Sequence, residues 1–401
     1  MRPGTLAAIV VVAAVLGGAA ALGVARAVGL IHTSSKTIVL RAPAVGDPTS
    51  APVVAAKPLV GNGFQPAQIF RARSAGVVTI VSYFDSAKAP DASAGQGSGF
   101  VVSRSGTILT DAHVVTTAGQ TSGTPEPART VYVEFADGDR VPARIVGYDL
   151  FDDVAVIRVD PRAHAVAPVP LGNSARIVVG QPVAAVGSPF GNADSLSVGV
   201  ISAVRRSIPS LTSKYDLIDA IQTDAPINHG NSGGPLFDAR GRVIGINAQI
   251  RSSGAGSGFE GVGFAVPIDS ARRSLEQLLA TGAVRYAYVG IKTEDLTPSI
   301  ARRFGYGASR GALVDSVVAG SGAARSGLVA GTRTAAFNGL GVRVGGDAIV
   351  AIDGIAVHSA EDVVRIVANR LEPGETARFT VVRGKSRRVV PVVLGERPSA
   401  G

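Results

Sequence analysis

The amino-acid sequence predicts a mainly β protein with two folded regions behind an apolar N-terminal segment. Short β-branched runs recur from about Gln68 to Val266, and Gly, Pro and Asp separate them. Such spacing is typical of an all-β barrel or sandwich. A helical pattern begins only at Ser270, and a second strand-rich region follows it. A chain of 401 residues has room for about two or three domains.

The N-terminal segment from Gly4 to Ala25 carries no charge and consists mainly of Ala, Val, Leu, Ile and Gly. As an α-helix it would be about 33 Å long, which is enough to span a bilayer. Arg2 precedes it and Arg26 follows it, so we expect residues 1–30 to be an uncleaved anchor. The alternative is a cleaved signal peptide with a small-residue site at 19–21. Both interpretations place the rest of the chain outside the cytoplasm.

Residues 31–66 contain repeated prolines and little periodicity, which is typical of a tether. We expect the first folded domain at 67–282 and the second at 284–395. In the first domain, β-branched runs predict strands, for example at Val77–Val81, Gly99–Val102, Val131–Phe135, Val154–Ile157 and Val243–Ile246.

The composition excludes several function classes. The net charge of +9 is compatible with a nucleic-acid binder, but the Arg residues are scattered and no aromatic residues alternate with them. We therefore expect no nucleic-acid partner. The absence of cysteine excludes disulfides, thiolate metal sites and a cysteine nucleophile. No metal or organic cofactor is expected.

Ser232 is the candidate nucleophile, and it lies in the Gly-rich run 230–236. A serine hydroxyl needs a base to remove its proton, and that base is usually a histidine oriented by a carboxylate. Glycines on both sides let the backbone turn sharply. The N–H groups of Gly230 and Ser232 could then converge as an oxyanion hole. A Gly-rich turn without function is the alternative for this run alone.

His113 and Asp153 are the candidates for the base and the carboxylate. His113 follows a predicted strand and a turn, and taken alone it is better explained as a core histidine. Asp153 enters an apolar strand, where a carboxylate is costly unless it is paired. We expect Asp149 and Asp152 to be turn residues instead.

An α/β-hydrolase is the competing enzyme class, because it also contains a GxSxG pattern. That fold has the order serine, acid, histidine. Only His358 follows Ser232. Ser359 and Asp362 look like a helix N-cap pair, so His358 is expected at the surface of a turn. An alternation of strands and helices is also missing before Ser232.

Three motifs occur in order: TDAHVV at 110–115, DLFDDVAVI at 149–157 and GNSGGPL at 230–236. Supporting segments are GSGFVV at 97–102, GSPFG at 187–191, TDAPIN at 223–228 and GFAVP at 263–267. From about Gln68 to Gly395 the sequence resembles the HtrA branch of the chymotrypsin-like serine proteases. The resemblance implies a double β-barrel followed by one PDZ domain.

By this resemblance the chain is a serine endopeptidase with His113, Asp153 and Ser232 as its catalytic triad. The substrate pocket would be lined by Ala225, Ile227, Ile246, Ala248 and Phe264. Because no acid lies at its base, we expect small or medium aliphatic residues before the cleaved bond.

The second region contains Tyr288-Val289-Gly290-Ile291, which resembles the carboxylate-binding loop of a circularly permuted bacterial PDZ domain. Backbone N–H groups of such a loop capture a peptide terminus. Val363, Ile366 and Val367 would form the apolar wall beside the peptide. Residues 345–354 match the GDxI…DG strand and turn of the family.

Three helices are predicted near this second region. They lie at Ser270–Ala280 with Gly282 as its cap, at Pro298–Phe304 with Thr297 as its N-cap, and at Ala360–Asn369. The stretch Gly331–Val344 is predicted to be an inserted hairpin-like loop.

The resemblance also implies partners: unfolded or peptide substrates, the membrane through the N-terminal segment, and further copies in a homo-oligomer, a trimer in related proteins. Quality control of exported bacterial proteins under stress would be its role. The alternative is a resting or inactive chaperone or scaffold that uses the PDZ domain, because HtrA relatives can rest with a misformed oxyanion hole.

Overall fold

The computed structural model describes residues 63–84, 94–118, 124–187, 195–228, 230–250 and 261–399. The candidate anchor at 1–30, the tether up to residue 62 and residues 188–191 of the GSPFG turn lie outside these described residues. Among the helices that are described, none has the length and apolar character needed to cross a membrane.

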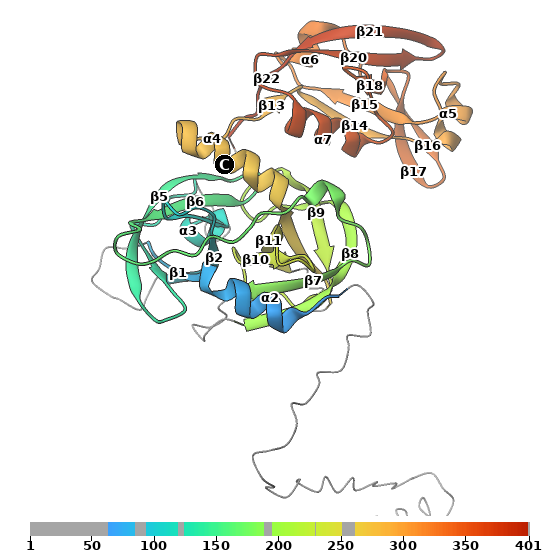
Figure 1. Cartoon of the computed structure of the whole chain (residues 1–401). Coiled ribbons are helices and arrows are strands. Elements are labelled where there is room, and N and C mark those ends of the chain that lie inside the picture. The colour runs from blue at the N-terminus through green and yellow to red at the C-terminus, as the bar shows by residue number, and fades with distance from the viewer. Residues whose placement is uncertain are drawn as a thin grey trace, which may run out of the picture. The chain divides into compact units, whose positions relative to one another are not determined.

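Two closed six-stranded barrels form the first domain (Figure 1). The first barrel has the strand order β1-β2-β3-β6-β5-β4. Its strands are β1 (Val77–Tyr83), β2 (Ala94–Val101), β3 (Thr107–Thr110), β4 (Thr130–Glu134), β5 (Arg140–Asp149) and β6 (Val154–Val159).

The second barrel has the order β10-β11-β12-β9-β8-β7. Its strands are β7 (Pro182–Gly187), β8 (Ser195–Pro209), β9 (Asp216–Thr223), β10 (Pro235–Phe237), β11 (Val243–Ile250) and β12 (Gly263–Pro267). The five predicted strand runs lie within these strands to within one residue. Closure into barrels decides between the two architectures that the strand spacing allowed.

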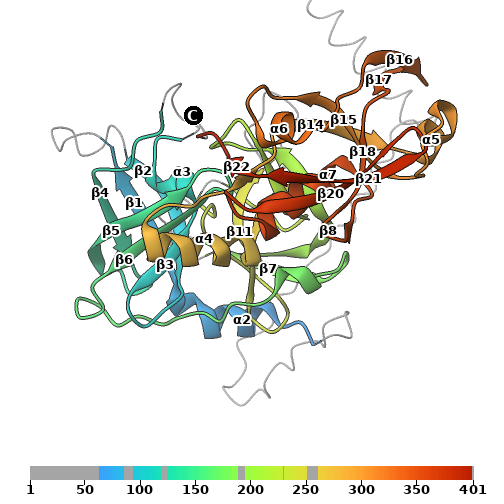
Figure 2. The ribbon, with the colours of Figure 1, turned by 90° about the horizontal axis from the view of Figure 1, so that it is seen from above.

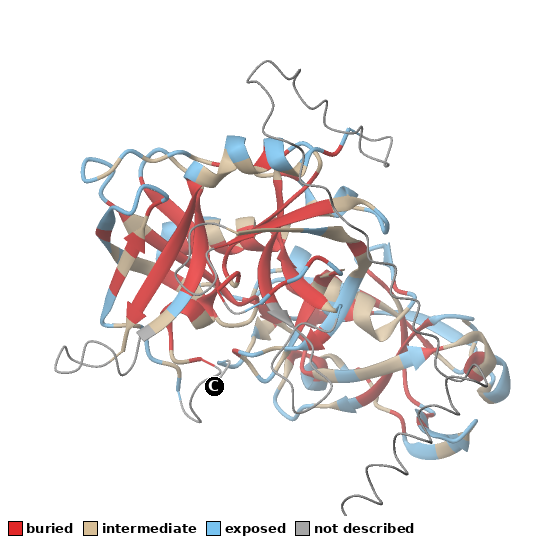
Figure 3. Cartoon of the chain, turned by 90° about the horizontal axis from the view of Figure 1, so that it is seen from below, coloured by how far each residue is buried: buried red, intermediate tan, exposed pale blue. Residues whose placement is uncertain are grey.

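Alternating apolar side chains fill the barrels, and the buried strands are visible in red in Figure 3. Phe100 and Phe237 are fully buried in one continuous core cluster that joins residues of both barrels. Burying side chains of this size stabilises the fold by roughly 1.5–3 kcal/mol each.

Helix α4 (Ile268–Thr281) packs on β5 and β6 of the first barrel and on β11 and β12 of the second (Figure 2). It ends at Gly282, whose φ of +76° suits the left-handed cap position, as predicted. Helix α2 (Pro66–Arg73) was not predicted, and Phe64 just before it is also buried. The short helices η1 (Ser74–Gly76), α3 (Ala112–Val115) and η2 (Ser174–Arg176) complete this domain.

The second domain contains a six-stranded sheet in the order β14-β15-β18-β20-β21, with β19 paired to β18. These strands are β14 (Ile291–Leu296), β15 (Gly311–Val317), β18 (Ala348–Ile352), β19 (Ile355–Ala356), β20 (Thr376–Arg383) and β21 (Ser386–Val393). A separate pair joins β13 (Ala287–Tyr288) to β22 (Gly395–Glu396).

The predicted hairpin is present as β16 (Arg333–Phe337) paired with β17 (Leu340–Val344). The predicted helices are α5 (Pro298–Phe304) and α7 (Ala360–Arg370), and α6 (Gly322–Ser326) lies between them in the sequence. Thr297 accepts a hydrogen bond from the Ile300 N–H, and Ser359 forms a capping box with Asp362. His358 is exposed in the turn before α7, as expected.

Candidate active site

His113 is positioned by the junction between β3 and α3. Asp111 is the N-cap residue of this four-residue helix, and the Ala112 N–H donates to the Asp153 carbonyl oxygen at 3.2 Å. The imidazole is 20% exposed, so one edge of the ring reaches solvent. The helix therefore fixes the histidine against the turn that carries Asp153.

Asp153 lies in the turn between β5 and β6 with a φ of +52°, a left-handed conformation that aspartate tolerates better than most residues. Its Oδ2 is 2.8 Å from His113 Nδ1, and its Oδ1 accepts the His113 backbone N–H at 3.0 Å. The two hydrogen bonds fix both the ring and the carboxylate. With Nδ1–H donating to Asp153, Nε2 is the ring nitrogen that can accept a proton.

The Ser232 loop is anchored to strands of both barrels. The Ser98 N–H on β2 donates to the Ser232 carbonyl oxygen at 2.8 Å, and the Gly233 N–H donates to Asn247 on β11 at 2.8 Å. Gly233 has a φ of +83°, and a Cβ there would lie 2.2 Å from the Ser98 oxygen and 3.1 Å from the Asp111 nitrogen. Only glycine fits, and the loop consequently lies directly beside the segment that carries His113.

The hydroxyl of Ser232 donates to the Ala248 carbonyl oxygen at 3.1 Å. The structure thus joins His113 and Asp153 directly, whereas Ser232 lies in the neighbouring loop with its hydroxyl bonded to β11. Gly230 has a φ of +100°, and its carbonyl oxygen accepts the Ser98 hydroxyl. Among the described residues, neither the Gly230 nor the Ser232 N–H has a hydrogen-bond acceptor.

The residues predicted for the substrate pocket are all buried, with exposures between 0% and 4%. Ala225 and Ile227 lie between β9 and the Ser232 loop, and the others lie on the adjacent strands β11 and β12. These last residues are Ile246, Ala248 and Phe264. All five residues are apolar, and their role in a substrate pocket stays a prediction.

Two carboxyl groups act on His113. Burial lowers its pKa, but the charges of Asp153 and then Asp111 oppose this and raise the pKa to about 9. Burial, and then the charge of Asp153, raise the pKa of Asp111 well above its usual value. The site therefore favours the charged imidazolium.

The side chains of Asp111, His113 and Asp153 are also the one group within the described ranges whose atoms could surround a metal ion, since these atoms lie within 4.8 Å of one another. His113 Nδ1 already forms its hydrogen bond with Asp153 at 2.8 Å. This contact is a hydrogen bond between imidazole and carboxylate, and it leaves no free nitrogen on that side of the ring.

The candidate carboxylate-binding loop connects β13 to β14. Gly290 has a φ of +81°, and a Cβ there would lie 2.1 Å from the Ser321 Cβ, so glycine is required for two reasons. Its carbonyl oxygen accepts the Val318 N–H at 2.8 Å, and the Val289 carbonyl oxygen accepts the Ala323 N–H at 3.0 Å. Val289 is buried, while Tyr288 and Ile291 are half-buried. The carbonyl groups of the loop are thus fixed by the segment around α6.

Helix α7 packs beside β13 and β14. Val363, Ile366 and Val367 on this helix are 3–6% exposed and belong to the core of the second domain. They pack in that core, and their role as the apolar wall beside a bound peptide stays a prediction.

Asp149 and Asp152 form contacts that the sequence did not reveal. Asp149 accepts the Phe151 N–H, as a turn residue should, but its other oxygen accepts the hydroxyls of Ser274 and Tyr286 at 2.7 and 2.6 Å. Asp152 accepts the guanidinium of Arg273 at 2.7 Å. These partners are more than a hundred residues away, so no local pattern indicates them.

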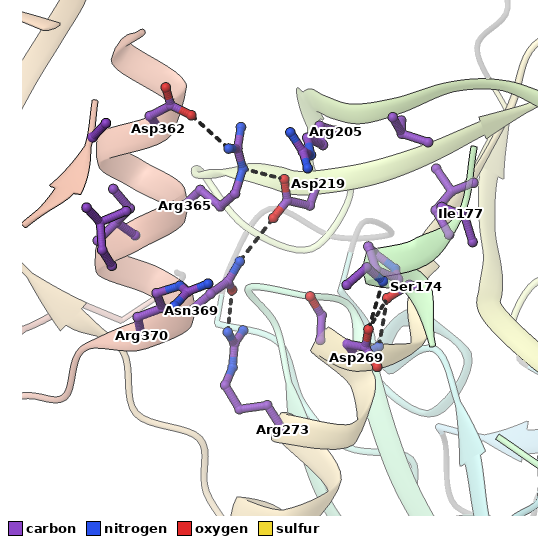
Figure 4. Close-up of a pocket in the computed structure, with 18 residues that line it drawn as sticks. Ser174, Ile177, Arg205, Asp219, Asp269, Arg273, Asp362, Arg365, Asn369 and Arg370 are labelled. Atoms are coloured by element: carbon purple, nitrogen blue, oxygen red, sulfur yellow. Dashed lines mark hydrogen bonds and ion pairs between the residues drawn. The ribbon is translucent and has the colours of Figure 1, made fainter. Parts of the chain in front are cut away.

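Side chains of α7 also contact the second barrel (Figure 4). Arg365 donates to Asp219 at 2.7 Å, and Asn369 donates to the same carboxylate at 3.0 Å. Arg273 donates to Asn369 as well. A cavity of about 730 Å³ lies between these elements.

Comparison with known proteins agrees with this geometry. A family model described as a trypsin-like peptidase domain matches residues 97–246, and one described as a PDZ domain matches residues 287–394. The solved structure of the HtrA-type protease AlgW with a tripeptide is 31% identical, with a TM-score of 0.68. The alignment covers 84% of this chain and 98% of that one.

The chain belongs to the family of HtrA-type proteases.

Curated HtrA relatives include a probable periplasmic serine endoprotease, DegP-like, from Halomonas elongata. It is 37% identical over 304 residues, which cover 76% of this chain and 57% of the relative. Protease Do-like 1, chloroplastic, from Arabidopsis thaliana is 38% identical, with 76% and 64% covered. The chain thus spans less than two thirds of the length of these relatives.

Proposed function

We propose that the chain is a serine endopeptidase in which Ser232 is the nucleophile, His113 is the general base and Asp153 orients the base. The observation that carries this proposal is the hydrogen bond between Asp153 and His113 Nδ1 at 2.8 Å. It leaves Nε2 as the proton acceptor, and the Ser232 loop lies beside the same segment.

The proposed reaction begins when the Ser232 hydroxyl leaves the Ala248 carbonyl oxygen and donates to His113 Nε2. The serine oxygen attacks the peptide carbonyl while its proton moves to the imidazole. The N–H groups of Gly230 and Ser232 would hold the negative oxygen of the intermediate. Imidazolium then protonates the leaving amine, and water hydrolyses the acyl-enzyme with His113 again as the base.

The apolar surroundings of Ala225, Ile227, Ile246, Ala248 and Phe264 support a preference for small or medium aliphatic residues before the cleaved bond. A charged side chain there would lose its hydration without gaining a partner. Mass-spectrometric mapping of cleavage sites tests this preference, and an excess of Arg or Lys at that position would refute it.

Degradation of a reduced, chemically unfolded globular protein tests the enzyme itself. The full chain should degrade it, and Ser232→Ala should lower kcat by about 10⁴- to 10⁶-fold, because the nucleophile is lost while binding remains. Ser174→Ala, which removes a hydroxyl that bonds Asp269 on α4, is the matched control. Equal activity of wild type and Ser232→Ala would remove the proposal.

A resting chaperone or scaffold is the second candidate, and one observation favours it. The Ser232 hydroxyl bonds the Ala248 carbonyl oxygen at 3.1 Å instead of the imidazole. In this case the wild-type chain and the Ser232→Ala variant would suppress aggregation of the same unfolded protein equally well. Light scattering measures this suppression.

We also propose that the second domain binds the C-terminus of peptides. The loop Tyr288–Ile291 would present N–H groups to the terminal carboxylate, and the peptide would add as a strand beside β14, next to α7. Support comes from Gly290, whose conformation turns the backbone while its carbonyl oxygen is bonded elsewhere. A fluorescent peptide with a free terminus should bind, and its amidated form should not.

The proposed setting is outside the cytoplasm, with residues 1–30 as a membrane anchor. Relatives named as periplasmic proteases support the compartment, and the uncharged segment Gly4–Ala25 supports the anchor. Carbonate extraction of membranes from expressing cells distinguishes an anchor from a cleaved signal.

A trimer is proposed from the family, and light scattering coupled to gel filtration measures it. The substrates would then be damaged exported proteins.

A further inference from the structure

The carboxyl group of Asp111 is buried and lacks a hydrogen bond among the described residues. Its side chain is 0% exposed, and neither carboxyl oxygen has a hydrogen-bond partner within the described ranges. The Gly233 N–H lies close enough to lower the pKa of Asp111, but it donates its hydrogen bond to the Asn247 carbonyl oxygen at 2.8 Å. A buried polar group without partners is costly and rare, and it requires a physical explanation.

The position of Asp111 gives that explanation. Its Oδ2 is 4.0 Å from His113 Nδ1, the nitrogen that bonds Asp153 at 2.8 Å. Two carboxyl groups thus approach the same side of one imidazole from different elements. Asp111 comes from the junction of β3 and α3, and Asp153 comes from the turn between β5 and β6.

The charges that act on His113 come from Asp153 and Asp111. The Ser232 loop, the third element at this site, contributes the uncharged backbone of Gly233. Charges interact strongly where water is excluded, so a second carboxylate at about 4 Å stabilises a charged imidazole substantially. Burial, and then the charge of Asp153, raise the pKa of Asp111, so this acid binds a proton more readily than usual.

We propose that Asp111 is a positioning residue for the proposed reaction: a second buried carboxylate that acts through space on His113 and keeps its imidazole charged in the resting protein. A charged imidazole cannot accept the serine proton. Asp111 consequently withholds the general base at neutral pH and releases it as the pH rises. This inference rests on the proposed role of His113.

The first test is the pH profile of kcat/KM for Asp111→Asn in the full chain, with the reduced unfolded protein as substrate. Asparagine has the same shape, no charge, and is also a good N-cap residue. We expect the acid limb to move down by about one pH unit, so that kcat/KM at pH 7 rises about tenfold. A residue with a purely structural role would instead lower the rate at every pH and leave the limb in place.

The second test does not need activity. The ¹⁵N NMR titration of His113, assigned by its absence in His113→Gln, is measured in a Ser232→Ala background with and without Asp111→Asn. The midpoint should fall by about one pH unit. If Asp111→Asn does not fold, Asp111→Ala removes the same charge and should give the same shift.

Asp149→Asn is the matched control, because Asp149 at the end of β5 is also buried but bonds Ser274 and Tyr286. It should leave the His113 titration unchanged. An unchanged midpoint in both Asp111 variants overturns the inference. A shifted midpoint, together with a wild-type chain that does not cleave the unfolded protein, supports the action of Asp111 on His113 and refutes the proposed function.

Discussion

Asp111 and Asp347 are two acids with the same burial and opposite surroundings. Both side chains are 0% exposed. Asp347 in the second domain accepts two hydrogen bonds from Arg383 at 2.9 and 2.8 Å and one from the Val329 N–H at 2.8 Å. Asp111 in the first domain has none within the described part of the chain.

The difference distinguishes a buried carboxylate that holds segments of the fold together from one that acts on a titratable side chain. The hydrogen-bonded carboxylate of Asp347 ties the residue before β18 to β20 and to the segment after α6. The carboxyl group of Asp111 has no such hydrogen bonds, and its Oδ2 lies 4.0 Å from His113 Nδ1. Titratable side chains with shifted pKa values concentrate at functional sites.

The largest expected effect is at Asp153, the acid that bonds His113 directly. Asp153→Asn should lower kcat by about 10⁴-fold, because an amide in this position no longer selects the tautomer with a free Nε2. Steady-state cleavage of the unfolded substrate measures it. Asp152→Asn is the control on the neighbouring residue, whose partner is Arg273. A loss of similar size in both variants would show that the turn, and not the carboxylate, is responsible.

The pH dependence of the wild type is the next effect. His113 must be neutral to act as a base, and its pKa is raised from 6.5 to about 9. The rate should therefore rise with pH until about 9, and be about a hundredfold lower at pH 7. The contribution of His113 to the stability of the fold changes with pH in the opposite direction. The charged pair stabilises the fold fully below pH 6.5, and this contribution is lost as the pH rises through about 9. A rate plateau below pH 7 would contradict both statements.

Matched amide substitutions compare the two acids in stability. Asp347→Asn should lower the free energy of unfolding by about 2–3 kcal/mol, because it leaves Arg383 without its carboxylate. Asp111→Asn should change it by less than about 1 kcal/mol, because no hydrogen bond is lost. Urea denaturation of each variant measures both values. An equal loss in the free energy of unfolding at both positions would show that burial, and not hydrogen bonding, sets the contribution of these acids to stability.

The smallest expected effect concerns a single cap in the second domain. Ser359 accepts the Asp362 N–H at 3.2 Å, and Asp362 accepts the Ser359 N–H in return. Ser359→Ala should cost about 1 kcal/mol and leave cleavage of the unfolded substrate unchanged. Thermal unfolding of the variant against the exposed Ser386→Ala checks the value. A large loss of cleavage would mean that α7 also supports the active site.

Much of the architecture could be predicted from local patterns. The strand runs, the helix caps at Thr297, Ser359 and Gly282, and the hairpin at 331–344 are confirmed because each depends on neighbouring residues. The pairing of His113 with Asp153 was predicted from motif order, and the structure brings the two side chains together. The catalytic roles of these residues stay predictions.

Other features depend on partners distant in sequence. Helix α2 was missed because its sequence shows no clear helical periodicity, and its Ile69 is buried only against the assembled barrels. Asp149 and Asp152 were expected to be simple turn residues, since their partners Tyr286, Ser274 and Arg273 come from α4 and the segment after it.

The sequence by itself indicated the strand-rich fold class and the two domains, because periodicity and glycine placement act over short distances. It indicated the three residues proposed for catalysis through the resemblance of their motifs to a known family. Only the tertiary structure decided that the Ser232 hydroxyl bonds Ala248, and that the Asp111 carboxyl group lies without a hydrogen bond beside His113. Burial and the distance between charges set these properties, and both arise only when distant segments pack together.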